Sequence, residues 1–180
     1  MKRVNLTINF TPQSPPTSTP VEIRDGVPNV SHGFFFSDGF SRAWLFGGES
    51  NNNASVANTI WRFEPERATE PWTLLDVGRD KVSPRIHSGA GCNVPWIGTG
   101  FYLGGVSTAA DNSVQYNHRL AIFNMRTESI DWKPVPDFVP VVNQRLVHLK
   151  AGEGHGVLVA LAGQTERNKI LSVVSVSRGV

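Results

Sequence analysis

The chain has 180 residues, of which 39% are hydrophobic and 18% charged, with a formal net charge of +2 and one cysteine, Cys92. This composition excludes a disordered or collagen-like chain and an intrachain disulfide. No basic run exceeds two residues, no apolar run approaches the roughly 18 residues that cross a bilayer, and no signal peptide is recognisable, so nucleic acid binding and a membrane span are not expected and the compartment stays open.

The N-terminal segment, 1–25, predicts two strands, at 4–10 and 21–24, around a loop rich in Pro, Ser and Thr. Here and along the whole chain, short apolar or alternating runs lie between turn signals, and no 3.6-residue periodicity is sustained. The sequence therefore predicts an all-β protein.

Two longer segments follow, 30–76 and 85–135, and each predicts four strands. The first four are expected at 31–36, 42–47, 59–64 and 71–76, and the second four at 86–92, 100–104, 119–124 and 130–134. The last segment, 145–180, predicts a partial unit of the same kind, with one more strand at 169–176.

A repeat relates these segments. An apolar run before a glycine occurs as WLFGG at 44–48, as FYLGG at 101–105 and, more weakly, as VALAG at 159–163, at intervals of 57 and 58 residues. Trp72 follows Phe63 by nine positions, and Trp132 follows Phe123 by nine positions. Four antiparallel strands in a repeat of about 50 or more residues are typical of a β-propeller blade.

The order of these landmarks, an apolar run, Gly-Gly, a spaced aromatic residue and a Trp, resembles the kelch repeat. The sequences around these landmarks are similar to those of fungal kelch-type propeller proteins, which are related in fold to galactose oxidase. These segments are SRAWLFGGES, PWIGTGFYLGG and LKAGEGHGVLVALAGQ. Phe in place of the usual Tyr is a departure from the kelch pattern. We assign the landmark residues structural roles in building blades: Gly47, Gly48, Phe63, Trp72, Gly104, Gly105, Phe123 and Trp132.

About three repeats fit in 180 residues, whereas propellers close with about four to eight blades. The sequence therefore predicts an incomplete propeller, with half blades at both ends. Open strand edges of this kind favour aggregation or self-association.

Arginine precedes the first strand of a repeat at Arg85 and again, 60 residues later, at Arg145. The kelch resemblance implies that arginines at the channel mouth bind acidic groups of a protein partner, since a guanidinium matches a carboxylate. The alternative is that these arginines bridge neighbouring blades through backbone carbonyls. His32 and His87 are predicted in first strands, which line the channel, and are weaker candidates for binding there.

Metal and redox chemistry find little support. The five histidines match no metal-binding spacing, the Glu, Asp and His set of iron-dependent kelch proteins is missing, and Cys92, Tyr102 and Tyr116 give no sign of a shared copper-radical site. No cofactor or catalytic residue is therefore predicted.

Three classes of function stay open. The first is a non-enzymatic kelch scaffold whose loops bind a protein partner. The second is a fragment of a secreted oxidase-like or carbohydrate-related propeller, which by resemblance would be extracellular or membrane-attached. The third is a truncated gene product without independent function.

Overall fold

The computed structural model describes residues 27–50, 60–67, 69–77, 86–109, 113–136, 138–139, 141–151, 156–164 and 174–177. These residues form β-strands, turns and one short 3-10 turn, η2 (Pro95–Ile97), so the prediction of an all-β protein is confirmed. The strands predicted at 4–10 and 21–24, together with Arg85, lie outside the described residues.

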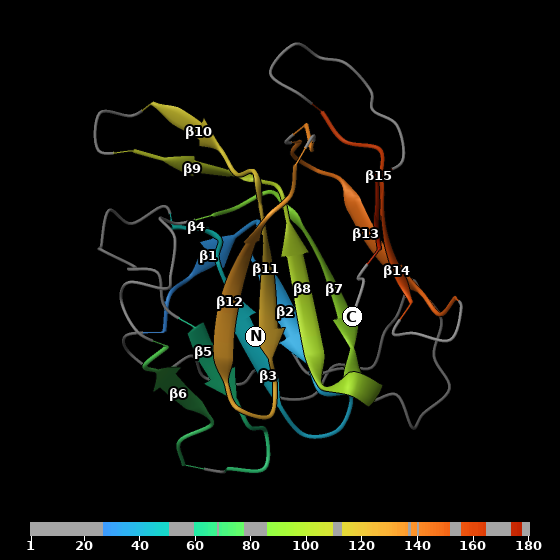
Figure 1. The fold of residues 1–180 in the computed structure, drawn as a ribbon. Coiled ribbons are helices and arrows are strands. Elements are labelled where there is room, and N and C mark those ends of the chain that lie inside the picture. Colours follow the sequence, from blue (N-terminus) through green and yellow to red (C-terminus); the bar gives the residue numbers. More distant parts are fainter. Residues whose placement is uncertain are drawn as a thin grey trace, which may run out of the picture.

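Three antiparallel sheets make up most of the structure (Figure 1). In each of them, strands that follow one another along the chain are neighbours. The first sheet contains β2 (Phe34–Ser37), β3 (Ala43–Phe46), β5 (Ile60–Phe63) and β6 (Trp72–Leu75). The second contains β7 (Ala90–Val94), β8 (Thr99–Leu103), β11 (Arg119–Asn124) and β12 (Ser129–Pro134). The third contains β13 (Arg145–Leu149), β14 (Val157–Leu161) and β15 (Val174–Ser177).

Two short two-stranded sheets extend one end of the larger sheets. They consist of β1 (Val30–Ser31) with β4 (Glu49–Ser50), and β9 (Val106–Thr108) with β10 (Val114–Tyr116). The same pairing recurs at each sheet, as Ser31 with Glu49, His87 with Val106 and Val142 with Gln164.

The four predicted strands of each longer segment are present, but both first strands begin later than expected, and the short strands β1, β4, β9 and β10 were not predicted. The strand expected at 31–36 begins at Phe34 in β2. Residues 86–92 were expected as the first strand of the second sheet, but β7 begins only at Ala90. The preceding residues leave the sheet because His87 pairs with Val106 in the neighbouring hairpin. The first strands of the three sheets lie together, with β7 in contact with both β2 and β13 (Figure 1).

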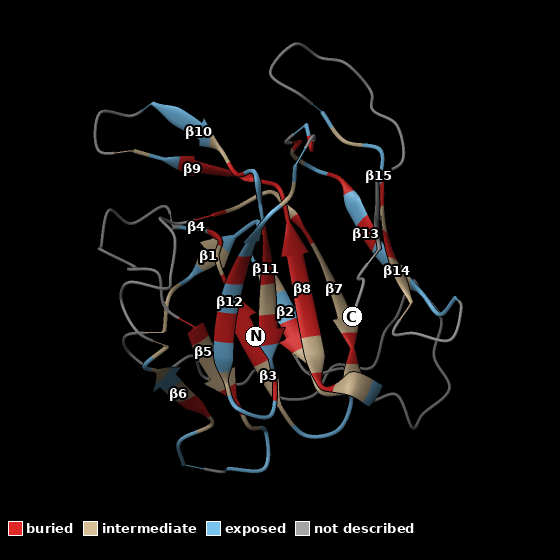
Figure 2. Cartoon of the chain, viewed as in Figure 1, coloured by how far each residue is buried: buried red, intermediate tan, exposed pale blue. Residues whose placement is uncertain are grey.

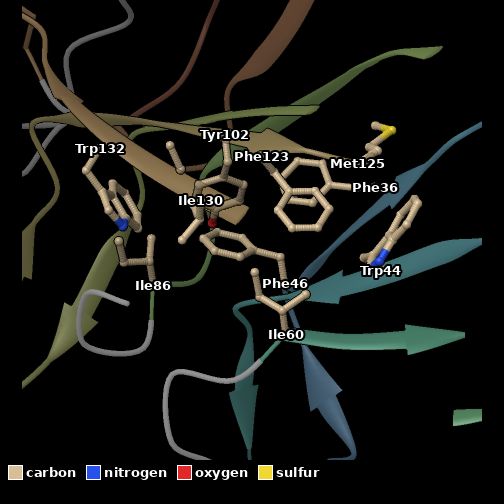
Figure 3. Close-up of a cluster of buried hydrophobic side chains, with 11 residues drawn as sticks. Phe36, Trp44, Phe46, Ile60, Ile86, Tyr102, Phe123, Met125, Ile130 and Trp132 are labelled. Carbon is tan, nitrogen blue, oxygen red and sulfur yellow. The ribbon is translucent and has the colours of Figure 1, made fainter. Parts of the chain in front are cut away.

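The first and second sheets pack through aromatic side chains (Figure 3). Phe36 stacks on Phe123 with ring centroids 5.2 Å apart, and Phe46 meets Tyr102 at 5.0 Å. The bulk of these rings is accommodated by glycine in the second sheet, because a Cβ at Gly100 would collide with the Phe36 ring. The buried residues concentrate in the middle strands of the two sheets (Figure 2).

The second and third sheets pack through mostly aliphatic residues. Their shared cluster includes Val94, Phe101 and Leu103 from the second sheet and Leu146 and Leu158 from the third. Each interface buries one face of two sheets, so the second sheet is covered on both faces. This packing holds the three sheets in a fixed order and brings their ends together along one edge.

Candidate functional site

One edge of the three sheets is built from tight backbone turns, and we call it the glycine edge. After β3 the chain bends at Gly47 and Gly48 with φ of 63° and 100°, and after β8 it bends at Gly104 and Gly105 with φ of 71° and 83°. Residues with a Cβ rarely adopt this left-handed region, so glycine is favoured there. The third sheet repeats the bend at Ala162 and Gly163, with φ of 56° and 118°.

The second glycine of each pair ties its sheet to the next one. The Gly48 amide donates to the carbonyl oxygen of Ile86 at 2.9 Å, and the Gly105 amide donates to that of Val141 at 3.0 Å. A Cβ at Gly47 would collide with the Ile86 carbonyl. The glycine pairs therefore close the backbone contact between neighbouring sheets as well as turning the chain.

A second row of bonds crosses all three sheets at the same edge. His32, Ser88 and Asn143 each lie two residues before a first strand and have φ of 56°, 59° and 57°. The Ser88 amide donates to the His32 carbonyl at 3.1 Å, and the Asn143 amide donates to the Ser88 carbonyl at 2.7 Å. Sequence reasoning missed this row. The available signal was three polar residues 56 and 55 positions apart, two of them of types enriched at positive φ.

Charged and titratable side chains gather along this row. His87 is half-buried and its Nδ1 lies 3.0 Å from Ser88 Oγ. Burial lowers the pKa of His87, and the positive charge of nearby His32 lowers it further, whereas the Glu49 carboxylate opposes the shift. His32 and Glu49 are exposed. The glycine edge thus offers an exposed imidazole and carboxylate on a backbone held by hydrogen bonds.

The two histidines were predicted in first strands, and this placement is wrong. His32 lies between β1 and β2, and His87 lies before β7. Both leave the sheet because positive φ at His32 and Ser88 turns the chain just before the strand begins. They are nonetheless brought near each other across the boundary between two sheets, since the amide of Ser88, next to His87, donates to the His32 carbonyl at 3.1 Å.

Of the two predicted arginines, Arg145 lies within the described residues and Arg85 lies outside them. Arg145 is the first residue of β13. Arg145 is exposed, and it shares a face of the third sheet with Val147.

The residues considered for redox chemistry do not meet. Tyr102 is buried, its hydroxyl accepts a hydrogen bond from the Gly89 amide at 2.8 Å, and burial raises its pKa far above the usual range. Cys92 pairs with Phe101, the neighbour of Tyr102, and so points to the opposite face of the sheet. Burial also raises the pKa of the Cys92 thiol, which disfavours the reactive thiolate.

The described part of the chain contains no group of three or more His, Cys, Asp or Glu side chains placed to hold a metal ion. Nor does any helix within it have the length and hydropathy needed to span a membrane.

The sequence analysis also did not predict an ion pair that joins the first and second sheets. Glu128, in the turn between β11 and β12, receives hydrogen bonds from Arg62 and from the indole Nε1 of Trp44, both in the first sheet. The φ of Glu128 is 54°, a left-handed conformation that costs free energy for a residue with a side chain. In this conformation the carboxylate points to the neighbouring sheet. No sequence motif marks this contact, because its partners are 66 and 84 residues away.

Comparison with known proteins identifies no family. No family description and no curated protein matches the sequence. Among solved structures, the chain is similar to that of YjhT, with a TM-score of 0.55 and 14% identity. The match covers 79% of this chain and 36% of YjhT, so this chain spans about a third of that protein, and the likeness concerns the fold alone.

Proposed function

We propose that this chain is a module of a kelch-type β-propeller and that it serves as a non-catalytic scaffold for a protein partner. Three features support the propeller arrangement. They are the recurring Gly-Gly, Phe and Trp landmarks, the gathering of first strands β2, β7 and β13, and the fold likeness to a longer protein. In this arrangement each of the three sheets is a blade.

The glycine edge is the proposed binding surface. The observation that carries this proposal is the row of hydrogen bonds that runs from His32 through Ser88 to Asn143. It joins three sheets by their backbones and leaves the side chains of His32 and Asn143 exposed. A polar surface that is ordered before binding loses little conformational entropy when a partner docks.

The chemistry of this surface indicates the kind of contact it makes. His32 and Glu49 are exposed polar residues close to each other at this edge, since Ser31, next to His32, pairs with Glu49 of β4. A folded protein that presents hydrogen-bonding and charged side chains would fit such a surface, whereas a small apolar ligand would not.

The test uses binding to a purified partner. A tagged 180-residue chain first captures candidate partners, and each candidate is then purified and titrated calorimetrically against wild type and two variants. Glu49→Gln removes the carboxylate at the glycine edge, and Glu66→Gln is its matched control, an exposed glutamate in the turn at the opposite edge. We expect Glu49→Gln to weaken binding about tenfold, as for other charged interface contacts, and Glu66→Gln to leave it unchanged.

A second variant, His32→Asn, changes the side chain but keeps a residue type that tolerates positive φ. It too should weaken binding. The proposal would be contradicted if a purified partner bound wild type and both glycine-edge variants with the same affinity. It would also be contradicted if no candidate partner bound after purification.

A further inference from the structure

Each sheet has two faces, which we define by their neighbours. The forward face lies toward the sheet that follows in the chain, and the rear face lies toward the sheet that precedes it. The forward face of the first sheet packs on the rear face of the second, and the forward face of the second packs on the rear face of the third. The rear face of the first sheet and the forward face of the third sheet therefore have no partner sheet among the described residues.

The forward face of the third sheet is apolar and open. Along β13 and β14 the side chains alternate, so that Leu146, Leu158 and Ala160 are buried against the second sheet. On the other face, Val147, Leu149 and Leu161 are 39%, 51% and 40% exposed. Exposed aliphatic residues gathered on one face indicate an interaction surface.

The rear face of the first sheet is also open in part. Phe35 and Leu74 are 44% and 51% exposed, beside a cluster formed by Leu45, Phe63 and Trp72. The indole Nε1 of Trp72 is buried without an acceptor among the described residues. A buried donor without a partner is costly, so this face is incomplete as it stands.

The two open faces correspond, residue by residue, to faces that already pack within the chain. The ring of Phe46 in the first sheet packs against the rings of Tyr102 and Trp132, with centroid distances of 5.0 Å and 6.2 Å. In the repeat, Leu161 takes the position of Phe46, because both are the last residue before the bend. By strand register, Leu45 and Leu74 take the positions of Tyr102 and Trp132, since Trp61 pairs with both leucines as Ala121 pairs with both aromatic residues.

The second correspondence concerns the first strands. A Cβ at Gly91 would collide with the Phe34 ring, so Phe34 lies directly on that position of the second sheet. Arg145 opens β13 as Phe34 opens β2, and Phe35 takes the position of Gly91. Arg145 would then lie over an exposed aromatic ring, as the Arg119 guanidinium lies over Trp132 at 5.2 Å.

We propose that the forward face of the third sheet binds the rear face of the first sheet in a second copy of this chain. The contact repeats the packing between the first and second sheets, with Leu161 on Leu45 and Leu74, and Arg145 on Phe35. Because each copy carries both faces, two copies close into a ring. Each copy contributes its first, second and third sheets, so the ring contains six blades. Propellers close with about four to eight blades.

The test is complementation between two variants. Leu161→Asp disables the forward face of the third sheet, and Phe35→Asp disables the rear face of the first. Each variant alone lacks one of the two faces that every contact needs, whereas a mixture pairs the intact forward face of Phe35→Asp with the intact rear face of Leu161→Asp. Molar mass is measured by light scattering after size exclusion.

We expect wild type at twice the chain mass, each variant at the single-chain mass, and the equimolar mixture again at twice the chain mass. Val114→Asp is the control, since it places the same charge at another exposed apolar residue, on β10, and should leave the dimer unchanged. A monomeric wild type, variants that still dimerise, or natively folded variants that fail to complement each other would each overturn the inference.

The inference rests on the proposed propeller arrangement but not on the partner site. Leu161→Asp and Phe35→Asp should bind the protein partner as wild type does, and Glu49→Gln should keep the two-chain mass. Loss of self-association and loss of partner binding are therefore distinguishable outcomes.

Discussion

Arg62 and Glu128 form an ion pair across the boundary between the first and second sheets, with Arg62 Nη1 at 3.1 Å and 3.0 Å from the two carboxylate oxygens. Both side chains are mostly buried. The same carboxylate accepts the indole hydrogen of Trp44 at 3.0 Å. One residue of the second sheet thus satisfies two donors of the first, at the edge opposite the glycine edge.

Removing this carboxylate should destabilise the contact between the two sheets. Glu128→Ala leaves Arg62 without this partner and the indole of Trp44 without its acceptor, so we expect the free energy of unfolding to fall by about 1–3 kcal/mol. Glu66→Ala, an exposed glutamate in the corresponding turn of the first sheet, is the control and should change it by less than about 0.5 kcal/mol. Chemical denaturation measures both, and equal effects would contradict the role of Glu128.

The glycine pair should tolerate no side chain at its first position. Gly47→Ala introduces a Cβ that collides with the Ile86 carbonyl and that disfavours φ of 63°. We expect a loss of about 2–4 kcal/mol in the free energy of unfolding. Gly39→Ala is a useful comparison, because its φ is 77° but its Cβ meets nothing closer than 3.5 Å, so it reports the backbone cost alone. Equal losses in the two variants would show that the Ile86 contact contributes nothing.

The third sheet offers the reverse substitution. Ala162 takes the place of the first glycine of the pair and has φ of 56°. Ala162→Gly relieves this strain, and although glycine also gains entropy in the unfolded chain, we expect a net stabilisation of about 0.5–1 kcal/mol. Thermal unfolding measures the gain. A lower melting temperature than that of wild type would contradict the equivalence of the three bends.

His87 should make stability depend on pH. Its pKa is lowered in the folded state, first by burial and then by His32, so the unfolded chain binds the proton more readily. The stabilisation is therefore fully present above the ordinary histidine pKa of 6.5 and is lost as the pH falls below it.

The measurement compares the free energy of unfolding at neutral and at acidic pH. We expect a decline on acidification in wild type and a smaller decline in His87→Gln. His118→Gln, which changes an exposed histidine, should decline as wild type does. If His87→Gln and wild type lose the same stability, neutral His87 makes no contribution.

Much of the secondary structure could be predicted because its causes are local. Apolar runs such as Trp44 to Phe46 and Phe101 to Leu103 alternate faces within four-stranded units, and glycine marks each bend. The first strand of the second sheet was placed too early because His87 follows an apolar residue but pairs outside the sheet with Val106. The equivalence of Arg85 and Arg145 stays a prediction, because Arg85 lies outside the described residues.

The sequence by itself determined the all-β class, the four strands of each of the first two sheets and the positions of the glycine bends. These follow from alternation, turn residues and the backbone freedom of glycine, which act over a few residues. Only the tertiary structure decided which sheet faces pack, that His32, Ser88 and Asn143 form one row, and that Glu128 binds Arg62 and Trp44. Those contacts join residues about 55 to 84 positions apart, and they depend on how whole sheets are oriented. Local sequence patterns carry no information about that orientation.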